Sequence, residues 1–498
     1  MRTAHFLGNC LGAALALAVL VVFVTQWLRF VLSVDGGTGL AALFLWLVLG
    51  VNITVWATVG MVRLGDDSVR ALADRTRHRR QTWRFGKRGR HHSGRARRTP
   101  AGPEAEGRTD SGSAPATTSA PQDLTLAVII PAHNEEPVIA DAISSALRLF
   151  HRRDVYVVSD SSQDRTADIA AETGVNVLEL LTNYGKAGAL DAAIETFELT
   201  ERYDGVVLLD ADTELDSAYV RGVREQLSDP KVAAVAGFVV ADWDPAGRTV
   251  VGRLISAYRD RLYWMLQYLL RFGQTWRHTS VTSIVPGFAS AYRSSVLRQL
   301  NINPKGLVIE DFNMTFEVHH KRLGRISMRP GTKAYCQDPF TFGDYVKQVR
   351  RWTLGFWQTV RLHGPWLSLF WVALACYILE ILFVALLLLA TACLAVFTLL
   401  PVLTDGAVLS LGWYAAGYEA VTAALPLTVV AVGLLVPDYI LTCVLATLRR
   451  RPSYLVYGLF FLPMRLVDAY LILRTIPQSW TTASDGRWSS PDRAATRL

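Results

Sequence analysis

Cysteine is scarce in this sequence, and its few occurrences are poorly placed for cross-links or metal ligands. The 498 residues include five cysteines, and none of them forms a Cys-x-x-Cys pair. Four of the five lie in apolar stretches, where cysteine behaves as a small hydrophobic residue. The spacing therefore argues against a disulfide framework and against a structural zinc site. The five are Cys10, Cys336, Cys376, Cys393 and Cys443.

Acidic residues are missing from one basic tract, and this tract accounts for the positive net charge. The formal charge is +8, yet residues 75–98 contain eleven Lys or Arg residues and no acid. A nucleic-acid-binding protein would spread its basic residues over a folded face, so we expect no nucleic-acid partner. The tract directly follows an apolar segment, which is typical of the cytoplasmic side of a membrane. We expect it to be attracted to anionic membrane lipids.

Charged residues are also few overall, and long apolar runs take their place. Hydrophobic residues make up 51% of the chain and charged residues 19%. Residues 6–34 and 40–62 are each long enough to cross a bilayer. A signal peptide is the alternative for the first run, but the run is too long and no small-residue cleavage pattern closes it. We therefore expect residues 1–63 to form an N-terminal transmembrane hairpin.

Similar runs return near the C-terminus. Residues 366–400 and 421–448 are long enough to span a membrane, whereas charged residues interrupt residues 454–476. The last segment could cross the membrane or line the protein interior. We assign residues 366–476 to C-terminal transmembrane helices, and residues 477–498 to a tail.

The positions of basic residues predict an orientation in the membrane. Arg449, Arg450 and Arg451 close one apolar run, and the tract at residues 75–98 closes another. Both ends should be cytoplasmic, which leaves residues 401–419 outside the cell membrane. Residues 64–123 combine the basic tract with a stretch rich in Ala, Ser, Thr, Pro and Gly. This composition predicts a disordered cytoplasmic linker, with a regulatory docking site as the alternative.

Alternating strand and helix patterns between residues 124 and 342 predict a soluble α/β domain. The alternation favours a mainly parallel sheet with helices on both faces. Functional sites in such sheets lie at the carboxyl ends of strands, where Pro131, Asp160 and Asp210 fall. The expected strands are residues 126–130, 154–158, 175–178 and 205–209, and the expected helices are residues 136–149, 166–172 and 187–199.

Asp210 and Asp212 form an Asp-x-Asp pair directly after the last of these strands. Hard oxygen ligands on a short turn suit Mg²⁺ or Mn²⁺, with nucleotide phosphates completing the coordination shell. Two acids in a surface turn are the simpler interpretation of the pair alone. Further along the chain, Glu310 and Asp311 offer a carboxylate that could act as a general base. An acidic helix N-terminus favoured by the helix dipole is the alternative there.

Residues 343–365 mix cationic and aromatic residues in the manner of a helix lying in a membrane interface. The segment contains Gln348, Arg351 and Trp352 in a Gln-x-x-Arg-Trp pattern. Arginine suits phosphate geometry, and an indole is a good platform for the apolar face of a sugar. The alternative is that these side chains only anchor the helix at the membrane.

These motifs, in this order and bracketed by apolar runs, resemble the family 2 membrane glycosyltransferases, which include hyaluronan, chitin, cellulose and poly-N-acetylglucosamine synthases. The resemblance implies a GT-A domain in which Asp311 is the general base. It implies that Asp210 and Asp212 bind the metal and the donor, that Gln348 and Arg351 face the donor diphosphate, and that Trp352 stacks against the acceptor sugar. Asn313 stands where the family usually has a second Asp, which weakens any role for this position.

The resemblance extends to the donor and acceptor pockets. It implies donor contacts from Pro131, Ala132 and Glu135, from Asp160, and from Lys186 in a Lys-Ala-Gly-Ala-Leu segment. Ser159 replaces the first Asp of the family's paired carboxylates, and Asp164 could simply cap the next helix. On the acceptor side it implies contacts from Gly287 and Phe288. Residues 487–493 resemble a gating segment of some synthases.

The function implied is inverting, processive transfer from a UDP-sugar to a growing polysaccharide that is exported across the cell membrane. By resemblance, the first choice of donor is UDP-N-acetylglucosamine, and Mg²⁺ or Mn²⁺ is the expected cofactor. Transfer of a single sugar to a lipid acceptor stays open, as does a role as a non-catalytic polymer conduit. A small membrane partner subunit is also left open.

Overall fold

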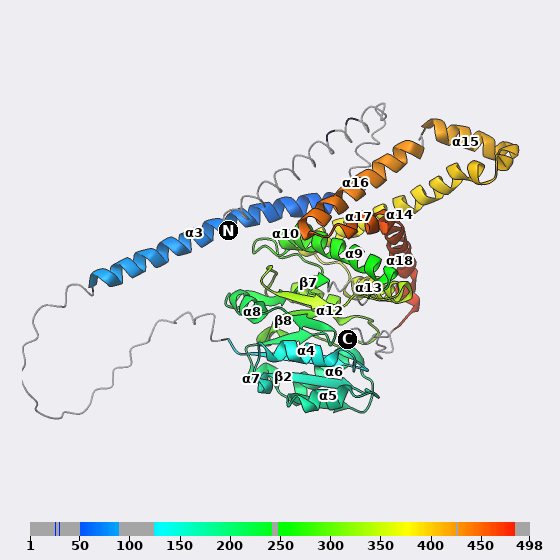
Figure 1. Cartoon of the computed structure of the whole chain (residues 1–498). Helices are drawn as coiled ribbons and strands as arrows, with labels where there is room; N and C mark the ends of the chain where they lie inside the picture. Colours follow the sequence, from blue (N-terminus) through cyan, green and yellow to red (C-terminus); the bar gives the residue numbers. More distant parts are fainter. Residues whose placement is uncertain are drawn as a thin grey trace, which may run out of the picture.

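The structure is a computed structural model that describes residues 50–88, 124–241, 248–424 and 427–483, together with Thr25 and Arg29. Almost all of the first predicted membrane run and residues 40–49 of the second lie outside these residues, as do residues 89–123 of the predicted linker. The segment at residues 487–493 that resembles a gating element lies outside them too. Figure 1 shows an α/β domain with long helices gathered on one side of it.

A seven-stranded sheet forms the centre of the α/β domain, with strand order β3-β2-β1-β4-β8-β6-β9. The first four strands of this order are parallel, which confirms the predicted arrangement. Strand β8 runs antiparallel to both of its neighbours, a reversal that the sequence pattern did not predict. The strands are β1 (Leu126–Ala132), β2 (Val155–Asp160), β3 (Asn176–Leu180), β4 (Gly205–Leu209), β6 (Val232–Ala236), β8 (Ala289–Arg293) and β9 (Arg325–Ser327).

Helices cover both faces of this sheet, because successive strand residues point to opposite sides. On one face Val128 and Ile130 of β1 pack in a core with α4 and α8. On the other face Ala127 and Ile129 pack with α6 and α12. The helices of the domain are α4 (Ile139–Leu147), α5 (Thr166–Glu172), α6 (Gly185–Thr196), α7 (Leu199–Arg202), α8 (Tyr219–Leu227), α11 (Ser294–Leu297) and α12 (Glu310–His320), with a short 3₁₀ turn, η1, at Arg152–Asp154.

A second, three-stranded sheet lies beside the first and was not predicted. Its order is β5 (Thr213–Leu215), β10 (Lys333–Cys336) and β7 (Phe238–Ala241). Strand β5 begins directly after Asp212, and its Thr213 pairs with Cys336 in the antiparallel ladder. This pairing therefore fixes the position of the chain immediately after the Asp-x-Asp pair.

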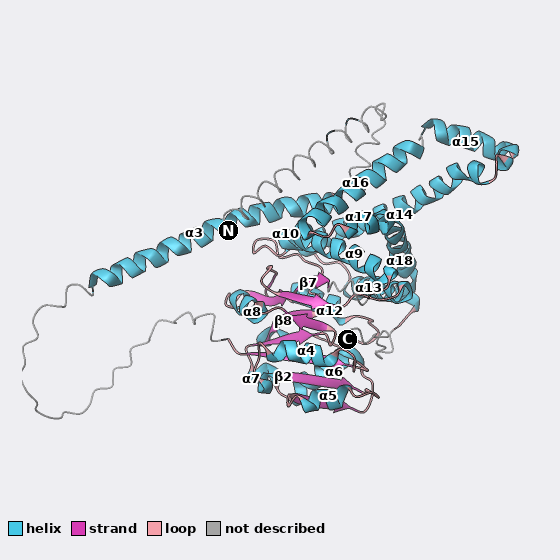
Figure 2. Cartoon of the chain, viewed as in Figure 1, coloured by secondary structure: helices cyan, strands magenta, loops and turns pink. Residues whose placement is uncertain are grey.

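The remaining helices form a layer next to the α/β domain, and α14 and α16 extend away from it towards α15 (Figure 2). Among the described residues, two helical stretches are long and apolar enough to cross a membrane, namely 369–403 and 453–481. The predicted multi-pass region is therefore not confirmed. The helices of this layer are α9 (Val250–Trp264), the π-helix η2 (Met265–Arg271), α10 (Phe272–Gln274), α13 (Phe342–His363), α14 (Leu369–Leu403), η3 (Ala407–Ser410), α15 (Gly412–Ala424), α16 (Leu427–Arg449), α17 (Ser453–Tyr457), η4 (Gly458–Phe460) and α18 (Phe461–Thr481).

Helix α18 covers the segment whose charged residues made the sequence ambiguous, and two of these residues face the protein. Asp468 accepts hydrogen bonds from the hydroxyls of Tyr258, at 2.8 Å, and Tyr345, at 2.5 Å. Arg465 donates to Asp438 of α16 at 2.7 Å. These polar contacts fasten α18 to α9, α13 and α16, since a buried charge is stable only with partners.

Helix α3 (Val51–Arg88) corrects the boundary of the predicted disordered linker. The helix continues from residue 64 to Arg88, where the composition had suggested a chain without regular structure. Residues 66–85 contain neither Gly nor Pro, the two strongest helix breakers. Arg70 also pairs with Asp66 and Asp67 one turn earlier, which supports the helix locally.

Candidate active site

Lys186 joins two of the predicted motifs at the carboxyl end of the large sheet. Its Nζ lies 2.8 Å from Oδ1 of Asp210, which follows β4, and 3.0 Å from Oε1 of Glu310, which begins α12. It also donates to the carbonyl of Gly287 at 3.4 Å. Burial alone would lower the pKa of Lys186, but Asp210, Glu310 and Asp311 raise it well above the ordinary value. The lysine is therefore a fixed positive charge among carboxylates.

Asp311 is held in place by a very close approach of the backbone. The Gly287 N–H donates to Oδ2 of Asp311 at 2.8 Å. A Cβ at position 287 would meet Oδ1 of Asp311 at 2.0 Å, so only glycine fits there. Burial and the neighbouring Glu310 raise the pKa of Asp311 to about 8. Once deprotonated, a carboxyl with this pKa is a stronger base than an ordinary aspartate, and it can accept a proton at mildly alkaline pH.

The two adjacent carboxyls of α12 differ in proton affinity because their neighbours differ. Burial would raise the pKa of Glu310, but the ion pair with Lys186, a backbone hydrogen bond and the charge of Arg351 together lower the pKa below its ordinary value. Asp311 lacks such a direct cation contact and shifts the other way. Carboxyl pairs whose pKa values are pushed apart in this manner are typical of acid–base sites.

The Asp-x-Asp pair lies at the same site, on the turn between β4 and β5. The Asp210 N–H donates to the carbonyl of Phe288 at 2.9 Å, and Oδ1 of Asp212 accepts from the Thr213 hydroxyl at 3.2 Å. Burial and the negative charge of Asp212 raise the pKa of Asp210, even though Lys186 opposes the shift. A divalent cation would relieve this repulsion, so the residues fit one. Within the described residues no group of three His, Cys, Asp or Glu side chains could bind a metal alone.

Asp160 organises the loop that carries Lys186. Its Oδ1 accepts from the Tyr184 N–H at 2.9 Å and its Oδ2 accepts from the Gly185 N–H at 2.7 Å. The side chain is fully buried, and burial raises its pKa despite these hydrogen bonds. Gly185 begins α6 with φ of 74°, a conformation that favours glycine. Asp160 thus fixes the start of the helix that presents Lys186.

The first loop of the domain lies against the same region. Pro131 and Ala132 end β1 and are buried, and the Glu135 N–H donates to the Thr166 hydroxyl at 2.9 Å. His133 Nδ1 lies 2.6 Å from the carbonyl of Asp160. Asp164 accepts from the Thr166 N–H at 3.0 Å, which agrees with its predicted role at the start of α5.

Helix α13 brings the Gln-x-x-Arg-Trp residues towards α12. A Cβ at Gly355 would lie 3.0 Å from the Ile309 side chain, so the glycine allows the two helices to approach closely. Gln358 accepts from the Val308 N–H at 3.0 Å. Arg351, one turn before Gly355, is exposed and is among the charges that lower the pKa of Glu310. Arg351 therefore lies within electrostatic reach of Glu310.

Arg259 of α9 is a site residue that no sequence motif indicated. It donates to Oε1 of Gln348, and its guanidinium carbon lies 4.3 Å from the centre of the Trp352 ring. It also donates to the Tyr263 hydroxyl at 2.7 Å, which holds its other nitrogen. A guanidinium over an indole is a favourable cation–π arrangement. Arg259 thus contacts both Gln348 and Trp352, the first and last residues of the Gln-x-x-Arg-Trp pattern. The sequence could not indicate these contacts, because α9 and α13 lie far apart along the chain.

One predicted contact needs correction, and one expected weak role can be compared with the structure. The Phe288 side chain is buried in the hydrophobic core, so an acceptor contact from its ring does not fit its position. Asn313 is buried as well, where it donates to the Asn301 carbonyl at 2.7 Å and contacts His363 at 2.8 Å. Position 313 therefore has a structural role in joining α12 to α13, consistent with the weak role expected from its departure from the family pattern.

Replacing Gly287 by alanine is expected to lower turnover between about tenfold and a hundredfold, because the new Cβ must displace the Asp311 carboxylate. Gly343→Ala is the matched control, since a Cβ there would meet only the Thr341 hydroxyl at 3.8 Å. Initial rates of sugar incorporation by the two purified variants measure the difference. Equal rates would show that the position of Asp311 does not matter.

Comparison with known proteins relates the central part of the chain to a known family. Residues 205–409, which include the Asp-x-Asp pair, Asp311 and the Gln-x-x-Arg-Trp residues, match the sequence model described as "Glycosyl transferase family group 2". Probable glycosyltransferase YdaM of Bacillus subtilis is 30% identical over 240 residues, which cover 46% of this chain and 54% of that protein. The poly-beta-1,6-N-acetyl-D-glucosamine synthase of Staphylococcus epidermidis is 25% identical over 256 residues, which cover 47% and 57%.

The aligned part of the chain thus spans about half the length of these curated relatives. Among solved structures, a mannosyltransferase from Pyrobaculum calidifontis in complex with GDP-Man and Mn²⁺ has a TM-score of 0.45 at 18% identity, covering 72% of this chain and 88% of that chain. No conclusion rests on this weak structural likeness. The family match and the mixed α/β sheet agree with the expected GT-A domain. Residues 205–409 thus match the family 2 glycosyltransferases, a family of sugar-transferring enzymes, and the rest of the chain lies outside this match.

Proposed function

We propose that this chain is a membrane-embedded, inverting glycosyltransferase that polymerises a sugar from a UDP-sugar donor, with UDP-N-acetylglucosamine as the first choice. The observation that carries the proposal is the contact of Lys186 with both Asp210 and Glu310 beside Asp311. This arrangement puts a proton acceptor and a phosphate-facing acidic pair in one site. The relatives named as poly-beta-1,6-N-acetyl-D-glucosamine synthases support the choice of sugar.

In the proposed reaction the acceptor hydroxyl attacks the anomeric carbon of the donor, and the bond from that carbon to the diphosphate breaks. Asp311 takes the proton that the hydroxyl loses. Its Oδ2 is fixed by the Gly287 N–H, which leaves Oδ1 for the acceptor. Attack from the face opposite the leaving group inverts the anomeric centre, so an α-linked donor gives a β-linked product.

Neutralising the departing diphosphate is the second requirement. Asp210 and Asp212 would bind Mg²⁺ or Mn²⁺, which supplies positive charge to the phosphate oxygens. Lys186 and Arg351 bring further positive charge to the same side of the site. Arginine can offer two parallel hydrogen bonds to a phosphate, whereas lysine acts as a point charge.

Processivity and export form the finer part of the proposal. The half-buried Trp352, whose ring contacts Arg259, carries an indole that suits the sugar at the end of a growing chain. The two candidate membrane helices lie in the layer that packs on α13, with α18 contacting it directly. A polymer leaving the site would therefore meet these helices next. We place the α/β domain in the cytoplasm, on the side where nucleotide sugars are made.

Incubation of the purified full chain with a panel of radiolabelled nucleotide sugars tests the proposal. We expect incorporation from one UDP-sugar, dependent on a divalent cation, into a product that forms a ladder on denaturing gels. A single-sugar glycolipid would instead support transfer to a lipid carrier. Absence of incorporation from every donor would favour a non-catalytic conduit.

Replacing Arg259 by lysine is expected to shorten the product, because lysine keeps the charge but loses the planar face over Trp352. We expect the mean product length to fall several-fold while KM for the donor changes by less than about twofold. Arg253→Lys on the same helix is the control, since Arg253 contacts Tyr457 and the backbone of Arg248. Unchanged product length in Arg259→Lys would contradict this positioning role.

A further inference from the structure

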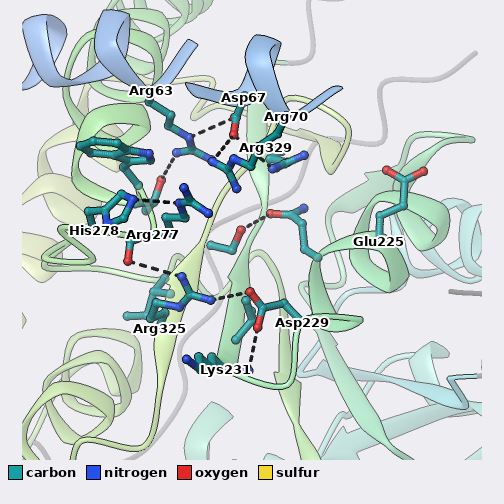
Figure 3. Close-up of a pocket in the computed structure, with 16 residues that line it drawn as sticks. Arg63, Asp67, Arg70, Glu225, Asp229, Lys231, Arg277, His278, Arg325 and Arg329 are labelled. Atoms are coloured by element: carbon teal, nitrogen blue, oxygen red, sulfur yellow. Dashed lines mark hydrogen bonds and ion pairs between the residues drawn. The ribbon is translucent and has the colours of Figure 1, made fainter. Parts of the chain in front are cut away.

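A cavity of about 620 Å³ lies on the opposite edge of the large sheet from β3, between α3 and strands β6 and β9. Figure 3 shows side chains from α3 and from the sheet edge converging on it. None of its lining residues belongs to the site around Lys186, and the proposed transfer reaction uses none of them. A cavity of this volume is in the range that binds small molecules.

Positive charge predominates among the side chains around this cavity. The lining includes six Lys or Arg side chains and His278, against three carboxylates. Asp66 does not line the cavity but pairs with Arg70 and Arg277, which do. When its negative charge is counted as well, the positive charges still outnumber the negative ones. The six cationic residues are Arg63, Arg70, Lys231, Arg277, Arg325 and Arg329, and the three acids are Asp67, Glu225 and Asp229.

Several of these cations retain donors for an additional partner. The Nε of Arg325 is buried and has no hydrogen-bond partner among the described residues, although its Nη2 pairs with Asp229. Arg329 is 51% exposed, and its approach to Asp67, at 3.6 Å, is longer than a hydrogen bond. Lys231 is exposed at the rim. The exposed side chains of Arg329 and Lys231 therefore keep donors that an oxygen-rich anion in the cavity could accept from.

The cavity also lies where α3 changes character. The helix is apolar up to Val62, in the run predicted to cross the membrane, and Arg63 is the first of its residues to line the cavity. Trp276 lies beside it and donates from Nε1 to Asp66 at 2.9 Å. Tryptophan and arginine at the end of an apolar helix are typical of the lipid headgroup level. A headgroup phosphate could therefore reach the cavity from the membrane.

We propose that this cavity is a binding site for a phosphate-bearing anion, either the headgroup of an anionic phospholipid or a soluble phosphate compound. Both have the charged oxygens that arginine binds in pairs. Because the lining comes from α3 and from the α/β domain, the bound anion would tie the two together. The competing explanation is an internal ion-pair network that needs no ligand, and the experiment below separates the two.

The test uses the purified full chain and a double variant, Lys231→Ala with Arg329→Ala. The control double variant, Arg153→Ala with Lys305→Ala, removes the same charge from exposed positions outside the cavity. Native mass spectrometry of protein released from nanodiscs of phosphatidylglycerol and phosphatidylcholine measures retained lipid. Calorimetric titration with inorganic pyrophosphate measures binding of a soluble anion.

We expect the wild type and the control to bind one of the two probes, and the cavity variant to bind it at least about tenfold more weakly, as loss of two charge-assisted hydrogen bonds implies. Retained phosphatidylglycerol that pyrophosphate does not displace identifies a headgroup site. Pyrophosphate binding in the absence of lipid identifies a soluble ligand. A double variant that carries Arg329→Lys in place of Arg329→Ala keeps the charge at this position. It should recover most of the affinity that the cavity variant loses.

Equal binding by the cavity variant and the control would overturn the proposal, because the basic tract at residues 75–98 would then explain any lipid retention. Failure of the wild type to bind either probe would overturn it too. The unfolding midpoint of each purified variant, measured in one buffer, shows whether the variant is folded. Because Lys231 and Arg329 are exposed, we expect their replacement to leave the fold intact. Sugar incorporation is not a readout here. Pyrophosphate bound at the proposed active site would be retained by the cavity variant and the control alike, so only a difference between these two variants supports the cavity site.

Discussion

Asp311→Asn is expected to lower sugar incorporation by about a hundredfold to ten-thousandfold, the range for loss of a general base. Asparagine has nearly the same shape as aspartate and keeps an oxygen that can accept from the Gly287 N–H. In the wild type this N–H donates to Oδ2 of Asp311 at 2.8 Å. It cannot accept the proton from the acceptor hydroxyl. Initial rates with a radiolabelled donor measure the loss, and calorimetric binding of UDP should change little.

Asp168→Asn is the matched control, since Asp168 is exposed on α5 and takes no part in the contacts described around Lys186. It should retain the wild-type rate. If Asp311→Asn kept more than about a third of that rate, another group would have to be the base.

The same residue gives a pH dependence of defined sign. Burial and Glu310 raise the pKa of Asp311 to about 8, so the side chain carries a proton at lower pH and cannot accept another. We therefore expect kcat/KM of the wild type to increase as the pH rises through about 8. If kcat/KM instead increased near the ordinary pKa of an aspartate, this limb of the pH profile would contradict the raised pKa of Asp311.

Lys186→Met is expected to lower the rate by about a hundredfold to a thousandfold, comparable with removal of a charge-stabilising donor from an active site. Methionine has similar length but leaves Asp210 and Glu310 without their shared cation. The loss also raises the pKa of Asp311 further, because Lys186 is one of the groups that lower it. The limb of the pH profile should therefore move to higher pH than in the wild type.

Two further variants make this result specific. Lys186→Arg keeps a positive charge and should leave the limb near its wild-type position, even if the rate falls. Lys305→Met removes an exposed lysine and should change neither rate nor limb. A slow Lys186→Met variant with an unmoved limb would mean that the lysine acts on folding or donor binding alone, which the unfolding midpoint and KM would separate.

Sequence patterns predicted the regular part of the α/β domain well. The expected strand at residues 205–209 and the expected helix at 166–172 have those bounds in the structure. Both are continuous patterns between polar turns, so local sequence is enough to define them. Strands β6, β8 and β9 and the small sheet of β5, β7 and β10 were missed. These strands have three to five residues each and no regular alternation with helices along the chain, so long-range pairing rather than a local pattern defines them.

The site divides in the same way. Residue types, their order along the chain and the family resemblance predicted roles for Asp210, Asp212, Asp311 and the Gln-x-x-Arg-Trp residues in phosphate, metal and proton transfer, and these roles stay predictions. Nothing in that order indicated which side chains touch. The cavity at α3 and the pairing of Arg259 with Trp352 were likewise absent from any motif, since their members come from separate elements.

By itself, then, the sequence determined the family, the alternation of strands and helices, and the chemical groups at the site. Only the tertiary structure decided that Lys186 contacts both Asp210 and Glu310, and that Asp311 rather than Glu310 has the raised pKa. The physical reason is distance along the chain. Lys186 and Gly287 are 101 residues apart, and the order of strands in the sheet brings them together. Proton affinity then follows from burial and from the neighbours that this folding creates.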